Sequence, residues 1–269
     1  MTRRLWLIAL AMLCLSGSAT AQNSGLVGLK DRDDVLGWEA VGRLDLGRTG
    51  FCTGTLIEND LVLTAAHCVY DNQGQLRPID DLTFRAGLRN GVAIAERSVI
   101  QMAAHPGFSL LGPRTADNIR HDVALLRLDA PISTTDADPF ILHGGRVDDG
   151  SISVTSYGRG RAEFPSRQRR CKLVEARDGL MAFDCDVTFG SSGAPVFGQV
   201  GGRGRILSII SAGTQIDGRA ISFGMALPAV VAELKQALRQ QPRVRHKVPD
   251  PIRRVTIGQR RSGAKFVRP

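Results

Sequence analysis

Long apolar runs are scarce in this chain of 269 residues, and their scarcity limits the roles that the protein can have at a membrane. A helix that crosses a bilayer needs about 20 consecutive apolar residues. The longest run, LWLIALAMLCL at Leu5–Leu15, has eleven residues, and no later segment comes close. We therefore expect no transmembrane anchor in the mature protein.

The first residues have instead the pattern of a secretory signal. Two arginines precede the apolar run, and the small residues after it end in an A-x-A cleavage site at residues 19–21. We interpret residues 1–21 as a signal peptide. The mature chain would then start near Gln22 and be exported, to the periplasm or to the medium. An N-terminal membrane anchor that is never cleaved is the alternative interpretation.

Metal-binding patterns are also missing. The chain has no C-x-x-C pair and its five histidines are scattered, so the sequence predicts no zinc site, and we expect no cofactor. Of the five cysteines, Cys14 belongs to the signal; an even number then remains in an oxidising compartment, which indicates disulfides. Three pairings are open. The local one, Cys52 with Cys68 and Cys171 with Cys185, closes two short loops, each bridge stabilising the fold by about 3 kcal/mol on the loop-entropy model.

The positive charge is concentrated at the C-terminus. The formal net charge is +9, but residues 242–269 hold nine Lys and Arg against one acid, and the rest of the mature chain is close to neutral. This segment is predicted to be a disordered basic tail. It could bind an acidic cell-surface polymer, lipid headgroups or nucleic acid, or be a solvated extension. Its one aromatic residue, Phe266, argues against specific recognition of single-stranded nucleic acid.

Long helical patterns are few, and short apolar runs separated by Gly, Asn, Asp and Pro favour an all-β fold. Residues 22–36 are polar and are interpreted as a flexible leader or pro-segment, and residues 37–241 as the folded domain. Two sets of six predicted strands suggest two six-stranded antiparallel β-barrels in one compact unit. The strands are predicted at Val41–Leu46, Gly50–Ile57, Leu61–Ala66, Leu82–Gly87, Glu96–Ala103, Asp122–Leu128, Ser151–Tyr157, Cys171–Ala176, Leu180–Cys185, Ala194–Gly198, Arg205–Ala212 and Ala220–Ala226. A short helix, Pro228–Gln241, ends the domain.

Three short segments hold residues suited to nucleophilic catalysis. His67 follows an apolar strand in LVLTAAHCV, Asp122 precedes another in RHDVALLRL, and Ser192 lies between glycines in GSSGAP. Taken singly, His67 could be a buried core histidine and Asp122 a capping acid. Together they match what acyl transfer needs: a serine nucleophile, a histidine that takes its proton, and a carboxylate that orients the histidine.

In the order His, Asp, Ser, the segments TGTLI, LVLTAAHC, DVALLRL and GSSGAP resemble the chymotrypsin/trypsin-like serine protease family over about residues 37–241. The resemblance implies two six-stranded β-barrels with the active site between them, followed by a C-terminal helix. It also implies that His67 is the general base, Asp122 its orienting carboxylate and Ser192 the nucleophile. His121 and Asp117 are nearby but weaker candidates.

The family's Gly-Asp-Ser-Gly-Gly-Pro motif falls on GSSGAP, so the N–H groups of Gly190 and Ser192 would form the oxyanion hole. The family also has a disulfide beside the catalytic histidine, which Cys52 and Cys68 match. Ser191 departs from the motif. In the animal enzymes the acid at this position pairs with a newly cut N-terminal amine, whereas serine has no charge to pair. The departure resembles bacterial secreted relatives, including the glutamyl endopeptidase group, and the oxyanion loop must be held in shape in another way.

Spacing against the family's motif also predicts a substrate pocket. Asp186 falls at its base, six residues before the nucleophile, with Asp184 as the competing candidate. Ser211 and Gly213 match the family's Ser-x-Gly, which pairs with substrate backbone, and Gly224 matches the second pocket glycine. An acid at the base favours Arg or Lys before the scissile bond. The residue before the Ser-x-Gly is isoleucine, where glutamyl relatives have histidine, which argues against acidic substrates. Alternatively, Asp186 is a solvated loop acid.

The sequence therefore predicts an exported, monomeric serine endopeptidase that cleaves proteins or peptides after Arg or Lys through an acyl-enzyme. A catalytically silent protease-fold protein that binds through its basic tail is the alternative from another class. An ester hydrolase would share the chemistry but not the TAAHC framework. Labelling of Ser192 by a serine-directed phosphonate probe separates an enzyme from a binding protein.

Overall fold

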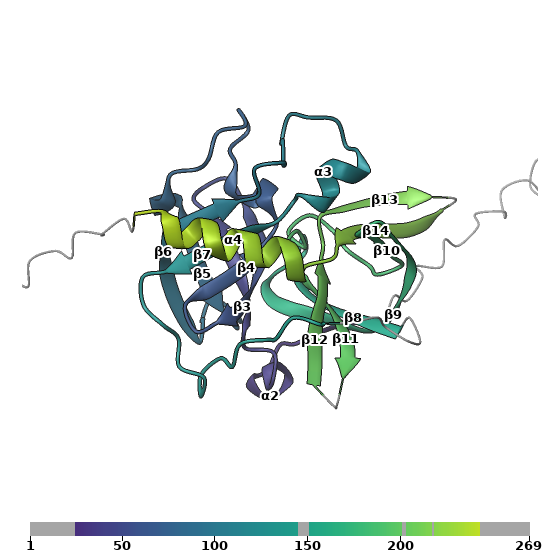
Figure 1. Ribbon diagram of the computed structural model, residues 1–269. Helices are drawn as coiled ribbons and strands as arrows, with labels where there is room; N and C mark the ends of the chain where they lie inside the picture. Colours follow the sequence, from purple (N-terminus) through teal and green to yellow (C-terminus); the bar gives the residue numbers. More distant parts are fainter. Residues whose placement is uncertain (1–24, 145–150, 201–202, 217, 243–269) are drawn as a thin grey trace, which may run out of the picture.

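The computed structural model describes residues 25–144, 151–200, 203–216 and 218–242 (Figure 1). The predicted signal peptide, residues 1–21, and the predicted basic tail beyond residue 242 lie outside the described residues. Within them the chain forms two β-structures, and helix α4 (Pro228–Gln240) packs across the first of them. Among the described residues, every helix falls short of the length and apolarity that a membrane crossing requires.

The first β-structure is a closed six-stranded barrel, as the sequence predicts, with the strand order β2-β3-β4-β7-β6-β5. Its strands are all antiparallel to their neighbours. Their bounds are β2 (Val41–Leu46), β3 (Phe51–Glu58), β4 (Leu61–Thr64), β5 (Leu82–Ala86), β6 (Ala95–Ala104) and β7 (Ala124–Leu128). Burial alternates along β5, from Leu82 through Phe84 to Ala86, because successive side chains of a strand point to opposite faces.

The second β-structure is a curled sheet of eight strands with the path β12-β11-β8-β9-β10-β14-β13, and β1 pairs with β9. Within the described residues this path does not close, unlike the predicted second barrel. Its two end strands are joined by only Ile210 and Ser211, so the sheet must curl until its ends meet. The strands are β1 (Leu26–Gly28), β8 (Ser151–Gly158), β9 (Arg161–Arg177), β10 (Leu180–Phe183), β11 (Pro195–Val200), β12 (Arg203–Ile209), β13 (Ala212–Ile216) and β14 (Arg219–Met225).

Strand β9 is much longer than the predicted Cys171–Ala176, because it begins at Arg161. The early part reads RAEFPSRQRR, and its buried residues are Pro165, Ser166 and Gln168 rather than large apolar side chains. The alternation of apolar and polar residues that predicts a strand is therefore absent from this part. Strand β13 was missed for a related reason, since all but one of its residues are exposed.

The N-terminal segment is part of the folded body from residue 25 onward, which corrects the prediction of a flexible leader over residues 22–36. Strand β1 pairs antiparallel with β9, and helix α2 (Arg32–Val35) follows it. The side chains of Leu29 and Val35 are buried, with 6% and 0% of their surface exposed. Two buried apolar residues and one strand pairing are enough to fix a segment whose composition is mainly polar.

Helix α4 lies against β6 and β7 of the first barrel, although it follows the second sheet in the chain (Figure 1). Its apolar face is buried as the helical spacing predicts, through Val230, Val231, Leu234 and Leu238. The side-chain amide of Gln101 on β6 donates to the carbonyl oxygens of Leu238 and Gln241, at 3.3 and 2.7 Å. These bonds satisfy carbonyl groups that the end of a helix leaves without partners.

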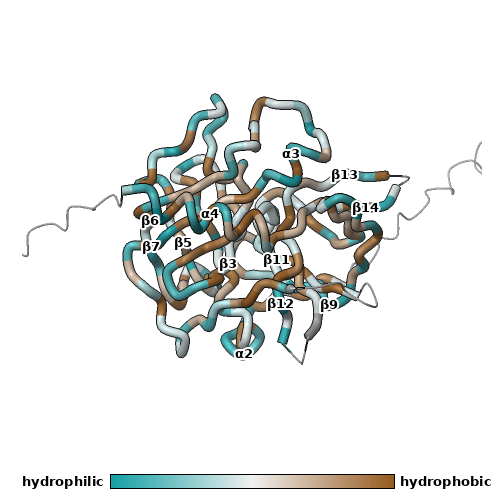
Figure 2. Tube along the Cα trace, in the orientation of Figure 1, coloured by the Kyte–Doolittle hydropathy of each residue, from teal (hydrophilic) through white to brown (hydrophobic). Residues whose placement is uncertain are grey.

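One cluster of buried apolar residues spans both β-structures, and a second cluster lies within the second sheet. Hydrophobic stretches run along the strands through the middle of the molecule, and hydrophilic stretches lie mostly in the outer loops (Figure 2). Tyr157 on β8 is fully buried, and its hydroxyl donates to the carbonyl of Leu88, after β5, at 3.0 Å. Burial raises the pKa of Tyr157 far above its ordinary value, so the hydroxyl stays neutral. This hydrogen bond is one of the contacts between the two β-structures.

Candidate active site

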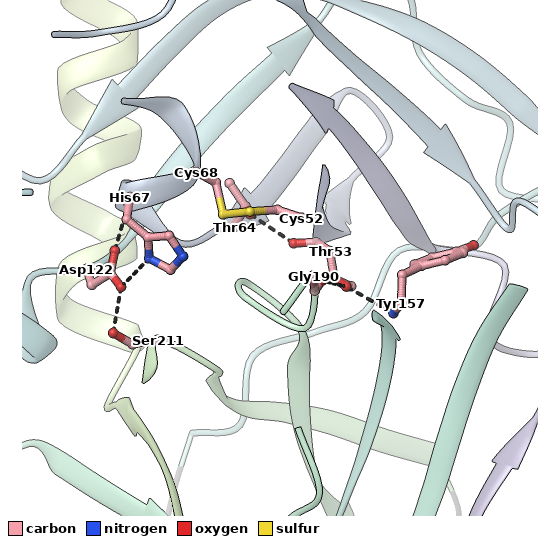
Figure 3. The surroundings of a disulfide bond; sticks show 9 residues. All are labelled: Cys52, Thr53, Thr64, His67, Cys68, Asp122, Tyr157, Gly190 and Ser211. Atoms are coloured by element: carbon pink, nitrogen blue, oxygen red, sulfur yellow. Dashed lines mark hydrogen bonds and ion pairs between the residues drawn. A yellow bond between two sulfur atoms is a disulfide. The ribbon is translucent and has the colours of Figure 1, made fainter. Parts of the chain in front are cut away.

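His67 and Asp122 meet because β4 and β7 are paired neighbours. Thr64, which ends β4, lies opposite Ala124, which begins β7. The chain therefore leaves β4 and enters β7 at the same edge of the barrel. His67 follows in the short 3₁₀ turn Ala66–Val69, and Asp122 comes just before β7. The His67 Nδ1 atom lies 2.7 Å from Asp122 Oδ2, and the His67 backbone N–H donates to Oδ1 at 2.8 Å (Figure 3).

A third group binds the same carboxylate. The Ser211 hydroxyl, between β12 and β13, donates to Asp122 Oδ2 at 2.5 Å (Figure 3). Asp122 is only 2% exposed, so this bond and those from His67 replace water as its partners. A buried carboxylate needs such donors, because removal from water is costly for a charged group. Three hydrogen bonds from two separate parts of the chain fix its position.

Ser192 lies in a tight loop that docks on β3 of the first barrel. The glycines on either side, Gly190 and Gly193, have φ values of +94° and +77°. A Cβ atom on Gly193 would lie 2.3 Å from both the carbonyl oxygen of Thr53 and Oγ1 of Thr64, so only glycine fits. The Thr53 hydroxyl donates to the Gly190 carbonyl at 2.8 Å (Figure 3). The Thr53 N–H donates to the Ser192 carbonyl at 2.9 Å.

Two backbone N–H groups of this loop are left without partners. The carbonyl before Gly190 accepts an N–H from the turn between β8 and β9 at 2.7 Å, and the carbonyl before Ser192 accepts the N–H of Ala194 at 2.9 Å. In a trans peptide the C=O and the following N–H point in opposite directions. The N–H groups of Gly190 and Ser192 therefore point away from these anchors. Within the described residues, neither of them has a hydrogen-bond acceptor.

A cleft of about 700 Å³ brings most of the predicted site residues together. Its lining includes His67, Asp122, Asp186, Ser192, Ser211 and Gly213. The backbone N–H of Asp186 donates to the side-chain oxygen of Gln168 at 2.7 Å, and its carboxylate makes no ion pair with any described residue. An unpaired carboxylate therefore lines the same cleft as the hydroxyl of Ser192.

Two of the pocket candidates lie outside this cleft lining. Gly224 is buried in β14, where a Cβ atom would lie 2.2 Å from the carbonyl oxygen of Ile209 and 2.3 Å from Oγ of Ser208. Its small size is needed for the close approach of β12 and β14. Asp184, the competitor of Asp186, is exposed and accepts the backbone N–H of Lys172 at 2.5 Å. Of the two acids, only Asp186 faces the cleft.

The four remaining cysteines form two disulfides, Cys52–Cys68 and Cys171–Cys185, which confirms the local pairing. The first links β3 to the turn that carries His67 (Figure 3). The sulfur atoms of Cys52 and Cys68 lie close to a ring nitrogen of His67, in the one cluster of metal-ligand atoms among the described residues. Both sulfurs are bonded to each other in the disulfide, so this cluster does not offer the thiolates that a zinc ion requires.

Comparison with known proteins agrees with this geometry. The family model for trypsin matches residues 32–223, which is more than half of the chain. The chain belongs to the trypsin family of serine proteases. Serine protease SP24D of Anopheles gambiae is 35% identical over 140 residues, which cover 49% of this chain and 47% of that protein. The vitellin-degrading protease of Bombyx mori is 30% identical over 162 residues, 56% of each chain. The chain thus spans about half the length of these curated relatives.

The fold of this trypsin-family chain is also found among solved structures. A structure of a Glu endopeptidase in complex with MPD is similar, with a TM-score of 0.66, and the match covers 81% of this chain and 97% of that one. The sequence identity is 18%, so the likeness shows the fold alone. It agrees with the all-β architecture of a closed barrel, a second sheet and a C-terminal helix.

The weaker candidates of the sequence, His121 and Asp117, are engaged outside the cleft. The ring of His121 stacks on that of His105, with centroids 4.3 Å apart and planes 2° from parallel. Asp117 lies 3.8 Å from Nδ1 of His121, and Glu233 on α4 lies 3.5 Å from Nε2 of His105. Burial, and after it the neighbouring His121, lowers the pKa of His105. This trypsin-family chain therefore carries a stacked histidine pair, and one of its two members, His121, directly precedes Asp122.

Sequence reasoning missed several residues that shape the loop around Ser192. Thr53 bonds both sides of the loop, and its hydroxyl also accepts the N–H of Tyr157 at 3.0 Å. Arg159, in the turn between β8 and β9, and Arg161, the first residue of β9, contact the loop from the other side. The only signal in the sequence was SYGRGR, in which two arginines alternate with glycines at a predicted strand end. Such a pattern does not reveal what the arginines contact.

Proposed function

We propose that this chain is an exported serine endopeptidase that uses His67, Asp122 and Ser192. The observation that carries the proposal is the arrangement of one cleft. The Nδ1 atom of His67 lies 2.7 Å from the buried carboxylate of Asp122, and His67 and Ser192 line the cleft together. The N–H groups of Gly190 and of Ser192 itself have no acceptor among the described residues, and the chain belongs to a family of serine proteases.

The proposed reaction begins with attack of the Ser192 hydroxyl oxygen on the substrate carbonyl carbon. His67 takes the hydroxyl proton on Nε2, since the contact with Asp122 favours the tautomer with its proton on Nδ1. The N–H groups of Gly190 and Ser192 stabilise the oxyanion, each contributing about 3–4 kcal/mol. The C–N bond then breaks as His67 gives its proton to the leaving amine. Water repeats the sequence on the acyl-enzyme and releases the acid.

We further propose that the enzyme cleaves after Arg or Lys. Asp186 lines the cleft together with Gly213, and its carboxylate has no ion-pair partner among the described residues. A substrate guanidinium or ammonium group would form a charge-assisted pair with this carboxylate. The substrates would be proteins or peptides that reach the cleft of a monomer.

Two disulfides support export, since disulfides persist in oxidising compartments such as the periplasm or the medium.

We propose that the basic residues 242–269 bind an acidic surface polymer. Deletion of these residues should weaken binding to dextran sulfate at low salt and leave kcat/KM on short peptides unchanged. Equal binding by the truncated and full chains would contradict this role for the tail.

The test of the proposed function is a peptide-library cleavage profile of the purified chain from residue 22. We expect cleavage after Arg and Lys that Ser192→Ala abolishes. Asp186→Ser should reduce kcat/KM on these substrates by at least about tenfold, the loss of one charge-assisted contact. Asp184→Ser is the matched control, because this neighbouring acid lies outside the cleft. Full activity of Ser192→Ala would refute the mechanism, and equal effects of the two Asp variants would refute the pocket.

A further inference from the structure

The turn between β8 and β9 contacts the loop before Ser192 at two points around Phe189. The backbone N–H of Arg159 donates to the carbonyl of Phe189 at 2.7 Å. The guanidinium of Arg159 lies 4.2 Å from the centre of the Phe189 ring, although that ring is 72% exposed. The carbonyl of Phe189 belongs to the same peptide as the Gly190 N–H. This anchor therefore fixes the direction of one proposed oxyanion donor.

The residue that follows this turn, Arg161 at the start of β9, contacts the loop through its side chain. Its guanidinium donates to the hydroxyl of Ser191 at 3.1 Å, to the hydroxyl of Ser156 at 2.9 Å, and to the Ser156 carbonyl. Ser191 is fully buried, and its hydroxyl also accepts the N–H of Thr188 at 3.2 Å. The Ser191 side chain thus links Arg161 to the turn that ends at Ser192.

Space for the guanidinium is created by a glycine. A Cβ atom on Gly158 would lie 2.8 Å from Cζ and 2.9 Å from a terminal nitrogen of Arg161. The Arg161 side chain makes no ion pair with any described residue. Burial lowers the pKa of Arg161 to about 10, while the nearby Asp186 carboxylate acts in the opposite direction. The guanidinium is therefore a charged group at neutral pH, held in a partly buried site by neutral oxygen acceptors.

Burial of a cation without a carboxylate in contact is unfavourable for folding. Its hydrogen bonds, however, all go to the strand end at Ser156 and to the loop at Ser191. From this geometry we propose that Arg161 is a positioning residue, which holds the loop at residues 188–191 so that the N–H of Gly190 faces the cleft. The inference rests on the proposed function. The inference adds that this internal arginine shapes the oxyanion site, and that the N-terminus is not needed for this role.

Two variants of Arg161 and one control variant test the role of Arg161 on a short peptide substrate. Arg161→Met keeps the length of the side chain but removes its hydrogen-bond donors. Its kcat should fall about 10- to 100-fold, which is less than the full loss expected when an oxyanion donor is removed. KM should change less than about threefold, because the substrate pocket is kept. Arg161→Lys should be intermediate. Arg127→Met is the matched control. Arg127 is also a partly buried arginine, but it lies on the first barrel and pairs with Asp60.

Chemical rescue separates positioning from a general loss of structure. Millimolar guanidinium ion should raise kcat of Arg161→Ala at least fivefold and leave the wild-type enzyme and Arg127→Met unchanged. The inference is overturned if Arg161→Met keeps kcat within twofold of the wild type. It is also overturned if the loss appears in KM alone, or if neither lysine nor guanidinium restores any activity to a folded variant.

The N-terminus supplies the second arm of the test. A chain with a Gly-Ser extension before residue 22 should have the kcat of the unextended chain, because Ser191 carries no charge that an amine would neutralise. If the extension abolishes activity while Arg161→Met does not, the N-terminus positions the loop and the inference fails. An inactive wild-type chain that no phosphonate probe labels would instead refute the proposed function itself.

Discussion

Substitution of Ser211 tests how the buried carboxylate of Asp122 is held. The Ser211 hydroxyl donates to Asp122 at 2.5 Å, and Asp122 is 2% exposed, so water cannot readily replace the lost donor. A hydrogen bond to a charged group contributes about 1.5–3 kcal/mol. Ser211→Ala should therefore lower the free energy of unfolding by about 1.5–3 kcal/mol at neutral pH. Two hydrogen bonds from His67 remain, so kcat should fall only about tenfold, which corresponds to about 1.4 kcal/mol.

The assay is urea unfolding followed by peptide hydrolysis, with Ser208→Ala as the matched control. Ser208 is also fully buried on β12, but its hydroxyl bonds to neutral backbone groups, at 2.8 Å from the Met225 N–H and 3.3 Å from the Ile209 carbonyl. Its loss should cost about 0.5–1.5 kcal/mol and leave kcat unchanged. If Ser211→Ala lowers the free energy of unfolding no more than Ser208→Ala does, the hydrogen bond from Ser211 to the Asp122 carboxylate does not contribute the expected amount of about 1.5–3 kcal/mol.

Three further changes have expected outcomes. Burial lowers the pKa of His105, so the unfolded chain binds more protons; the melting temperature should fall as the pH drops below about 6.5, and His105→Gln should flatten that fall. Gly193→Ala should lower the free energy of unfolding by about 2–5 kcal/mol, from its positive φ and its clash with β3, and should abolish peptide hydrolysis. Replacing Cys171 and Cys185 by serine should lower the unfolding free energy in urea by about 3 kcal/mol with kcat kept, because neither cysteine lines the cleft.

The sequence predicted those parts of the molecule that depend on local patterns. The first barrel follows from short apolar runs, and helix α4 from four apolar residues at helical spacing. His67, Asp122 and Ser192 were found because each stands beside a distinctive short segment. The resemblance then supplied their common site, and the pairing of β4 with β7 explains why His67 and Asp122 meet.

Other features depend on contacts between distant residues, and no local pattern records them. The Thr53 hydroxyl donates to the carbonyl of Gly190, which is 137 positions later. The Arg161 side chain donates to the hydroxyl of Ser191, which is 30 positions later. Strand β1 exists because β9 offers it a partner, although its own sequence is short. Gly224, predicted from its spacing as a pocket glycine, lies outside the cleft lining, and its small size allows a close approach of two strands.

The most direct test of the central claim is covalent labelling of the purified chain with a fluorophosphonate probe, followed by peptide mass spectrometry. The account predicts a single label on Ser192 in the wild type. His67→Ala should slow the labelling by at least a hundredfold, and Ser192→Ala should abolish it, while Ser191→Ala still takes the label at Ser192. Labelling at another serine, or unchanged labelling of His67→Ala, would contradict the proposed roles of Ser192 and His67.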